Sequence, residues 1–175
     1  MRARLLVWTL ACAALGACAS APRPVAGLSM PGQDEPAAAG LLGSYLLARG
    51  WTVRIANTGV VEATRGAERA ELRLLLADTG LDRLIAGRVY NASEGASPAD
   101  LAALARSLNE TLNVGTFSVV EDGVLFESSL PFLDELDPVL LDAFLDYGAD
   151  VRLAVTRVDE RHKVLAPVEG PAAGR

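Results

Sequence analysis

The sequence predicts an α+β fold in which helices flank an antiparallel β-sheet, in the order α-β-β-β-β-α-β-β-α. Three observations predict this class. Apolar residues recur at the helical period in three segments, and they alternate at the strand period in the segments between them. The alternating segments are joined by short turns that contain glycine. Such turns join antiparallel strands, because a parallel crossover needs about a dozen residues or more. We therefore expect one folded domain over residues 37–160.

The first half of this domain contains one predicted helix and four predicted strands. The helix covers residues 37–50 and ends at Gly50. Its apolar stripe consists of Leu41, Leu42, Tyr45 and Leu46. The strands are expected at residues 51–56, 60–64, 70–77 and 82–91. Two of them show clear alternation, with Trp51, Val53 and Ile55 on one face of the first and Leu72, Leu74 and Leu76 on one face of the third.

A second helix is predicted to begin at Ser97-Pro98-Ala99-Asp100. This segment combines a capping serine, a proline at the first helical position and an acid at the third. The apolar residues that follow keep the 3.6-residue period of a helix with one buried face. They are Leu101, Leu104, Ala105, Leu108 and Leu112.

The segment "GTFSVVEDGVLFES" predicts a β-hairpin with its turn at Asp122-Gly123. That turn would place Val119 opposite Phe126 and Glu121 opposite Val124, with Phe117 on the same core-facing side as Val119. A loop over residues 130–136 follows, and Asp137-Pro138 then begins the last helix. The apolar side of this helix consists of Leu140, Leu141, Phe144, Leu145, Gly148, Val151, Val155 and Val158.

The amino terminus has the form of a secretory signal peptide over residues 1–17. Arg2 and Arg4 precede thirteen apolar or small residues at positions 5–17. As a helix this run would extend only about 20 Å, which is shorter than the ~30 Å hydrocarbon core of a bilayer. The sequence therefore predicts a cleaved leader and not a membrane-spanning helix.

Cys18 directly follows Leu15-Gly16-Ala17, and this segment resembles the bacterial lipobox. The resemblance implies cleavage before Cys18 and attachment of a diacylglycerol and an acyl chain such as palmitate, which together would anchor the protein in a lipid bilayer. Because Ala19 and not aspartate follows, it also implies an outer-membrane lipoprotein facing the periplasm. The alternative is an ordinary signal peptide cleaved after Ala21, which would leave a soluble periplasmic protein.

The segments that flank the domain are predicted to lack regular structure. Residues 18–36 contain four prolines and no apolar period, so they are expected to form a flexible lipidated tether. Residues 161–175 are expected to be a disordered tail. Removal of residues 1–17 takes away two arginines and no acid, so the net charge falls from −6 to −8. Such a charge does not favour a nucleic-acid partner.

With this order established, two segments resemble the YbjN family, also called proposed bacterial sensory transduction regulators. They are "LLGSYLLARGWTVRI" and "LARSLNETLNVGTFSVVEDGVLFESSLPFL", within a resemblance that covers residues 38–158. The family's fold is similar to that of the type III secretion chaperones. The resemblance implies a binding or regulatory module that has no established reaction and whose chaperone-like relatives often dimerise. The lipobox departs from the cytoplasmic members of that family.

The sequence offers no pattern for catalysis, a metal or a cofactor. The only histidine, His162, lies in the charged segment after the last helix, and the domain lacks the histidine that a Ser-His-Asp triad needs. Both cysteines lie in the first 18 residues, so no cysteine and histidine cluster for zinc is expected. A small-molecule hydrolase with paired carboxylates is the least favoured interpretation.

Two groups of residues are candidates for binding a partner protein. Asp142, Asp146 and Asp150 recur every four residues and form either a solvated helix face or a contact for a basic surface. The apolar residues of the 130–136 segment either pack under the core or form an exposed patch for dimerisation or for a partner segment. They are Leu130, Phe132, Leu133 and Leu136, together with Pro131.

The sequence therefore predicts an outer-membrane lipoprotein whose periplasmic domain binds an unknown protein, with a homodimer as one form. The alternative is a structural envelope lipoprotein that is a passive subunit of a larger assembly.

Overall fold

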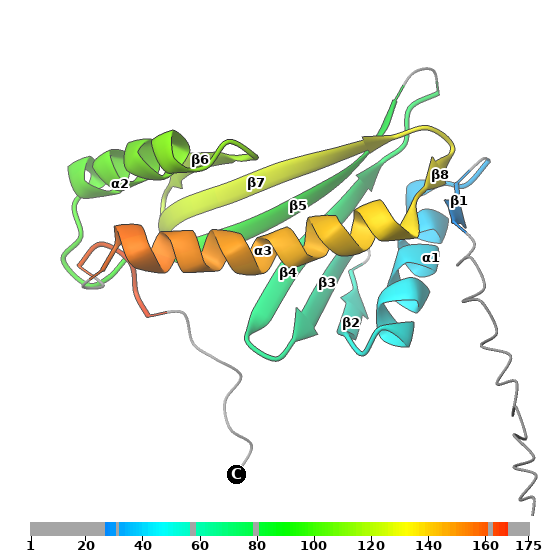
Figure 1. Ribbon diagram of the computed structural model, residues 1–175, viewed down its shortest axis with the longest axis horizontal. Coiled ribbons are helices and arrows are strands. Elements are labelled where there is room, and N and C mark those ends of the chain that lie inside the picture. Colours follow the sequence, from blue (N-terminus) through cyan, green and yellow to red (C-terminus); the bar gives the residue numbers. More distant parts are fainter. Residues whose placement is uncertain (1–26, 31, 57–58, 79–80, 161–162, 168–175) are drawn as a thin grey trace, which may run out of the picture.

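The computed structural model describes residues 27–30, 32–56, 59–78, 81–160 and 163–167. It has the predicted α+β class, with an antiparallel sheet and three helices on one of its faces (Figure 1). The elements are β1 (Leu28–Ser29), α1 (Glu35–Ala48), β2 (Thr52–Ile55), β3 (Val60–Arg65), β4 (Glu68–Leu75), β5 (Asp82–Asn91), α2 (Pro98–Thr111), β6 (Thr116–Val120), β7 (Gly123–Phe132), β8 (Glu135–Leu136) and α3 (Pro138–Val158).

The main sheet has six strands in the order β2-β3-β4-β5-β7-β6, and every neighbouring pair is antiparallel. The two ten-residue strands, β5 and β7, pair along their whole length, from Asp82 opposite Phe132 to Asn91 opposite Gly123. A separate two-stranded sheet joins β1 to β8. None of the helices within the described ranges is both long enough and apolar enough to cross a membrane.

Two hydrophobic clusters lie between the sheet and the helices, and α3 contributes to both. The first cluster lies under α1 and the first half of α3, where Leu42, Leu46 and Leu141 are fully buried. The second lies under α2 and the second half of α3, where Leu108, Phe117 and Val151 are buried. As the longest helix, with 21 residues, α3 therefore links the two halves of the core (Figure 1).

Each helix begins at an acid or serine that caps its free amide groups. The Asp34 carboxylate accepts a bond from the Ala37 amide at 2.8 Å, and the Asp137 carboxylate accepts one from the Val139 amide at 2.7 Å. Ser97 and Asp100 form the reciprocal bonds of a capping box, which confirms the predicted start of α2. These bonds satisfy amides that would otherwise have no partner in the first turn.

The domain extends beyond both ends of the predicted 37–160 range. Within the expected tether, Leu28 and Met30 are buried, and the Met30 amide donates to the Asp134 carbonyl at 2.7 Å. Within the expected tail, Leu165 is buried and the Ala166 amide donates to the Asn91 carbonyl at 2.9 Å. The predicted boundaries were wrong because single buried residues in short extended segments produce no period.

The predicted register of the β6–β7 hairpin was also wrong. Val120 lies opposite Gly123, so the turn consists of Glu121-Asp122, and Phe117 instead of Val119 lies opposite Phe126. Gly123 belongs to the strand, where a Cβ would collide with the Tyr90 carbonyl oxygen of β5. The glycine is therefore required by a close approach between strands, which the sequence signal for a turn cannot distinguish.

Candidate functional site

The 130–136 segment is not the loop that the sequence predicted. Residues up to Phe132 continue β7, and Leu136 belongs to β8. Phe132 and Leu136 are buried in the first cluster and Leu130 packs against it, so these three side chains are part of the core. Leu133 alone among the four candidates is a strongly exposed side chain, at 64%.

Leu133 lies in a tight turn that holds its side chain outward. Asp134 has a φ of 52°, a left-handed conformation that aspartate tolerates better than most residues. The Glu135 amide donates back to the Leu133 carbonyl, and the Asp134 carbonyl accepts from Met30. These main-chain bonds fix the turn from both sides.

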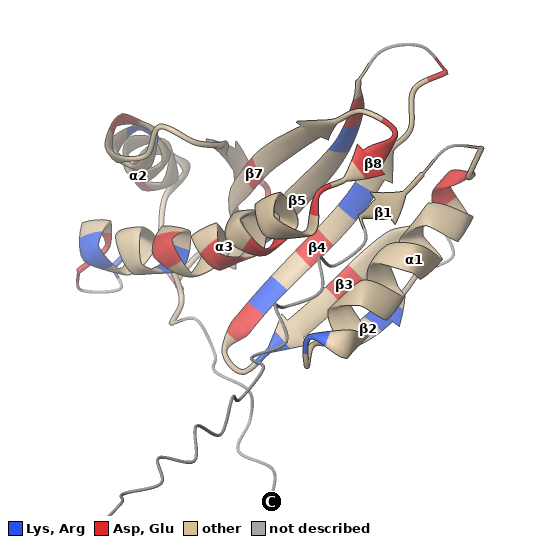
Figure 2. Cartoon of the chain, turned by 45° about the vertical axis from the view of Figure 1, so that its right-hand side comes forward, with Lys and Arg blue, Asp and Glu red and all other residues tan. Residues whose placement is uncertain are grey.

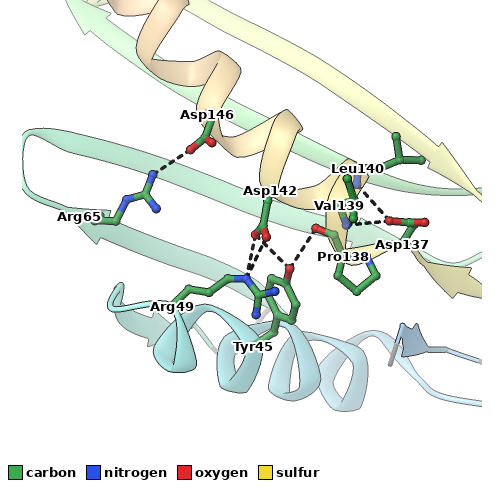
Figure 3. Close-up of polar contacts among 9 residues, drawn as sticks. All are labelled: Tyr45, Arg49, Arg65, Asp137, Pro138, Val139, Leu140, Asp142 and Asp146. Atoms are coloured by element: carbon green, nitrogen blue, oxygen red, sulfur yellow. Dashed lines mark hydrogen bonds and ion pairs between the residues drawn. The ribbon is translucent and has the colours of Figure 1, made fainter. Parts of the chain in front are cut away.

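The first turn of α3 adds two further exposed apolar side chains to this region. Val139 is 75% exposed and Leu140 is 56% exposed, although Leu140 was expected on the buried side of the helix. Leu140 points away from the contact between α3 and α1 (Figure 3). Leu133, Val139 and Leu140, which we term the β7–α3 apolar segment, lie within eight residues of chain that also contain Asp134, Glu135 and Asp137.

The acidic residues of α3 recur along the helix as the sequence predicted (Figure 2). Asp142, however, contacts side chains of its own chain. Its carboxylate accepts two bonds from Arg49 Nε, at 2.9 and 3.1 Å, and one from the Tyr45 hydroxyl at 2.9 Å. Figure 3 shows the three side chains converging between α1 and α3.

This contact, which we term the α1–α3 clamp, is partly shielded from solvent. The side chain of Arg49 is 25% exposed and that of Asp142 is 44% exposed. The Arg49 guanidinium lies 3.5 Å from the centre of the Tyr45 ring, which adds a cation–π contact. Burial, and then the hydrogen bond to Asp142, raise the pKa of Tyr45 far above its ordinary value.

Asp146 makes a second, more exposed connection one turn further along α3. Its carboxylate accepts from Arg65 Nη2 at 3.0 Å, while the Arg65 guanidinium lies 4.5 Å from the centre of the Trp51 ring. Since the Asp146 side chain is 69% exposed, this ion pair stabilises the domain less than the clamp does. Two of the three candidate acids thus hold α3 against α1 and β3.

Asp150 has a different environment from the other two acids. It is exposed and forms no salt bridge with another described residue. Its charge contributes, after burial, to a raised pKa of Tyr147, whose hydroxyl donates to the Val114 carbonyl at 3.2 Å. Of the predicted stripe, Asp150 therefore has the most freedom to contact a partner.

A depression of about 670 Å³ lies between α2 and the end of α3. Two of the three acids that line it, Asp100 and Asp159, have structural partners. A hydrogen bond from Ser97 lowers the pKa of Asp100, and the buried Asp159 accepts bonds from the Val164 and Leu165 amides. Among described residues, no group of three or more potential metal ligands comes together. Cys18, Ala21 and His162 lie outside the described residues.

The comparisons with known proteins support the fold. No family model matches the chain, and no curated protein is similar to it in sequence. The crystal structure of YbjN from E. coli, a proposed transcription regulator, is similar to this structure, with a TM-score of 0.51 and 13% sequence identity. The match covers 73% of this chain and 95% of YbjN. This chain therefore has a YbjN-like fold, as the sequence resemblance implied.

Proposed function

We propose that this protein is a lipid-anchored protein of the bacterial outer membrane whose YbjN-like domain binds another envelope protein, without catalysis. The β7–α3 apolar segment is the observation on which the proposal rests. Three large apolar side chains, each more than half exposed, occur within eight residues. Exposed apolar groups of this kind, surrounded by polar residues, are typical of protein-binding surfaces.

The charges around this segment favour a basic partner surface. Asp134, Glu135 and Asp137 lie beside the apolar side chains, and the protein without its leader would carry a net charge of −8. Acidic residues at the edge of an interface accelerate association with a basic partner more than they increase its affinity. The α1–α3 clamp supports such a surface because it fixes the start of α3 before a partner arrives.

The position of β1 relates the proposed surface to the proposed anchor. Leu28 and Ser29 pair with Leu136 and Glu135, so the chain enters the domain beside the β7–α3 apolar segment (Figure 1). A lipid on Cys18 would precede β1 by only nine residues. The partner is therefore expected at or near the same membrane.

The binding surface is tested by crosslinking and pull-down from membranes with the full-length protein. Leu133→Ser combined with Leu140→Ser is expected to reduce recovery of a specific partner at least tenfold. Leu153→Ser, a matched change on α3 at a side chain 46% exposed, is the control. Equal recovery with both variants contradicts the proposed surface. Light scattering on the same variants separates a different partner from a second copy of this chain.

The anchor has a separate test. Cys18→Ser is expected to shift the protein from the membrane fraction to the soluble periplasmic fraction, and mass spectrometry of the wild type should find acyl chains on Cys18. A wild-type protein that begins at residue 22 and carries no lipid would contradict the anchor and would leave the binding surface untouched.

A further inference from the structure

A hollow of about 220 Å³ lies where the end of α1, the end of β3 and the middle of α3 meet. It is smaller than the ~300–1,000 Å³ pockets that hold drug-sized ligands, so it suits a small molecule. We term it the α1–α3 hollow. Its lining residues are Arg49, Trp51, Arg65, Asp142, Leu145 and Asp146.

Two ion pairs frame the α1–α3 hollow. Asp142 pairs with Arg49 at 2.9 Å, and Asp146 pairs with Arg65 at 3.0 Å. The two aspartates are one helical turn apart on α3, so the pairs lie in succession along that helix (Figure 3). The four charges cancel, and the hollow therefore presents both signs of charge without a net charge of its own.

Both arginines retain hydrogen-bond donors that the described residues do not use. Arg49 reaches Asp142 through Nε, and no described residue accepts a bond from its two Nη atoms. Arg65 uses Nη2 for both Asp146 and Glu68, which leaves its Nε and Nη1 without a described acceptor. Since a guanidinium carries five N–H donors, most of the donors of each arginine are free to bind a ligand.

Trp51 adds a buried donor to the same hollow. Its side chain is only 4% exposed, and its Nε1 atom is buried without a hydrogen-bond partner. A buried indole N–H usually has an acceptor, and leaving it without one is destabilising. An acceptor inside the hollow would remove this cost.

Arg65 covers the Trp51 ring and controls access to it. Thr52 lies opposite Thr64, so the same register places Trp51 opposite Arg65, with both side chains on one face. The Arg65 guanidinium lies 4.5 Å from the centre of the ring. Because the Arg65 side chain is 41% exposed, it can move toward solvent and admit a ligand to the indole.

The excess of donors favours a carboxylate as one group of the ligand, because the planar guanidinium matches a carboxylate through two parallel hydrogen bonds. A carboxylate alone would add an uncompensated negative charge beside two aspartates. An ammonium group on the same molecule compensates it, and Asp146 is available because Arg65 occupies only its Oδ1 atom. We propose that the α1–α3 hollow binds a free α-amino acid, with its carboxylate on the two arginines and its ammonium on Asp146.

The remaining wall of the hollow indicates the kind of side chain that the amino acid carries. Leu145 and Trp51 both belong to the first hydrophobic cluster, and each keeps a small exposed area. An apolar side chain of moderate size, such as that of leucine, would bury this area and leave no further charge in the hollow. A charged side chain would have no partner there.

This inference goes beyond the proposed function, since the hollow and the β7–α3 apolar segment have no residue in common. A bound amino acid would connect α1, β3 and α3. Because it binds the folded state only, it should raise the melting temperature as its concentration increases.

NMR of the Trp51 indole N–H during titration with leucine tests the inference. The full-length chain carries Cys18→Ser and Trp8→Phe, so that Trp51 is its only tryptophan. The resonance should move and saturate with a Kd below about 1 mM, and Arg65→Gln or Asp146→Asn should weaken binding at least about tenfold. Arg54→Gln is the matched control and should have no effect, because Arg54 bonds to Glu62 outside the hollow.

Two analogues of leucine test the two charged groups separately. N-acetylleucine lacks the ammonium and leucine methyl ester lacks the carboxylate, so each should bind at least about tenfold more weakly than leucine. Arg65→Lys keeps the charge without the planar fork and should also weaken binding. An unchanged indole resonance before titration confirms that each variant is folded.

Three results would overturn the inference. An indole resonance that does not move with leucine would show that the hollow does not bind an amino acid. Equal binding of leucine and N-acetylleucine would show a site for carboxylates alone. Equal weakening by Arg54→Gln and Arg65→Gln would show that the response does not arise in the α1–α3 hollow.

Discussion

The two halves of α3 are attached to the rest of the domain by different interactions. In the first half, Asp142 and Asp146 form ion pairs with Arg49 and Arg65 above the first hydrophobic cluster. In the second half, Val151 and Val155 are buried in the second cluster, and none of the described residues forms a salt bridge with Arg152. Apolar burial thus attaches both ends of the helix, and only the first end has ion pairs in addition.

The part of the domain that packs against the second half of α3 has a neutral polar connection, between α2 and β6. The Asn109 side chain of α2 accepts from the Phe117 amide at 2.7 Å and donates to the Phe117 carbonyl at 2.8 Å. This pair replaces a missing strand partner at the free edge of β6. The comparison indicates that salt should weaken the first half of the domain more than the second.

The largest expected effect comes from truncation of the two cores. Leu141→Ala in the first cluster should reduce the free energy of unfolding by about 2–5 kcal/mol, through lost burial and a cavity. Val151→Ala in the second cluster removes less buried apolar surface and should reduce the free energy of unfolding by about 2 kcal/mol. Urea unfolding measures both. A single shared transition is expected because α3 spans both clusters, and two separate transitions would contradict that coupling.

The neutral connection is expected to have the next largest effect. Asn109→Ala leaves the Phe117 amide and carbonyl without their partner, which should reduce stability by about 1–3 kcal/mol. The loss should be the same at low and high salt, because neither group is charged. A loss that shrinks strongly with added salt would show that the comparison between the two halves is wrong.

The charged clamp is expected to have a smaller, salt-dependent effect. Asp142→Ala should reduce stability by about 1 kcal/mol at low salt and by less in 1 M salt, since the carboxylate is partly exposed. Asp150→Ala, a change of the same kind on the same helix without a salt bridge to a described residue, should have little effect. If the two variants are equally stable, the clamp does not position α3.

The smallest effect should appear in the titration of the tyrosines. All three, Tyr45, Tyr90 and Tyr147, have pKa values raised above the ordinary 10.0, chiefly by burial. Folded and unfolded states are therefore equally protonated well below pH 10, and stability falls as the pH rises above 10 because the unfolded state loses its protons first. Absorbance of tyrosinate at pH 10 should be much lower in the folded protein than in urea.

A good part of the fold follows from signals within a few residues of one another. The capping box of Ser97 and Asp100 determines the start of α2, and β5 has the bounds that the sequence predicts. The alternation of Leu72 and Leu74 places both in the core. These features are local because caps and alternation depend on neighbours in the chain.

The candidate site was less predictable because its parts are distant in sequence. The partners of Asp142 lie 93 and 97 residues away, so the spacing of the acids indicated a stripe but not what it contacts. The buried state of Phe132 and Leu136 depends on strands that pair only in the folded sheet. Exposure of Leu140 depends in the same way on where α3 crosses its neighbours.

The sequence by itself determined the class of fold, the order of the three helices and of the six strands of the main sheet, and the starts of α2 and α3. Only the tertiary structure decided which acids bind arginines, why Gly123 is required beside Tyr90, and which remote residues line the hollow between α1 and α3. The physical reason is the distance along the chain over which each kind of interaction acts. Local backbone preferences are set by adjacent residues, whereas contacts and openings are set by which remote segments share the sheet.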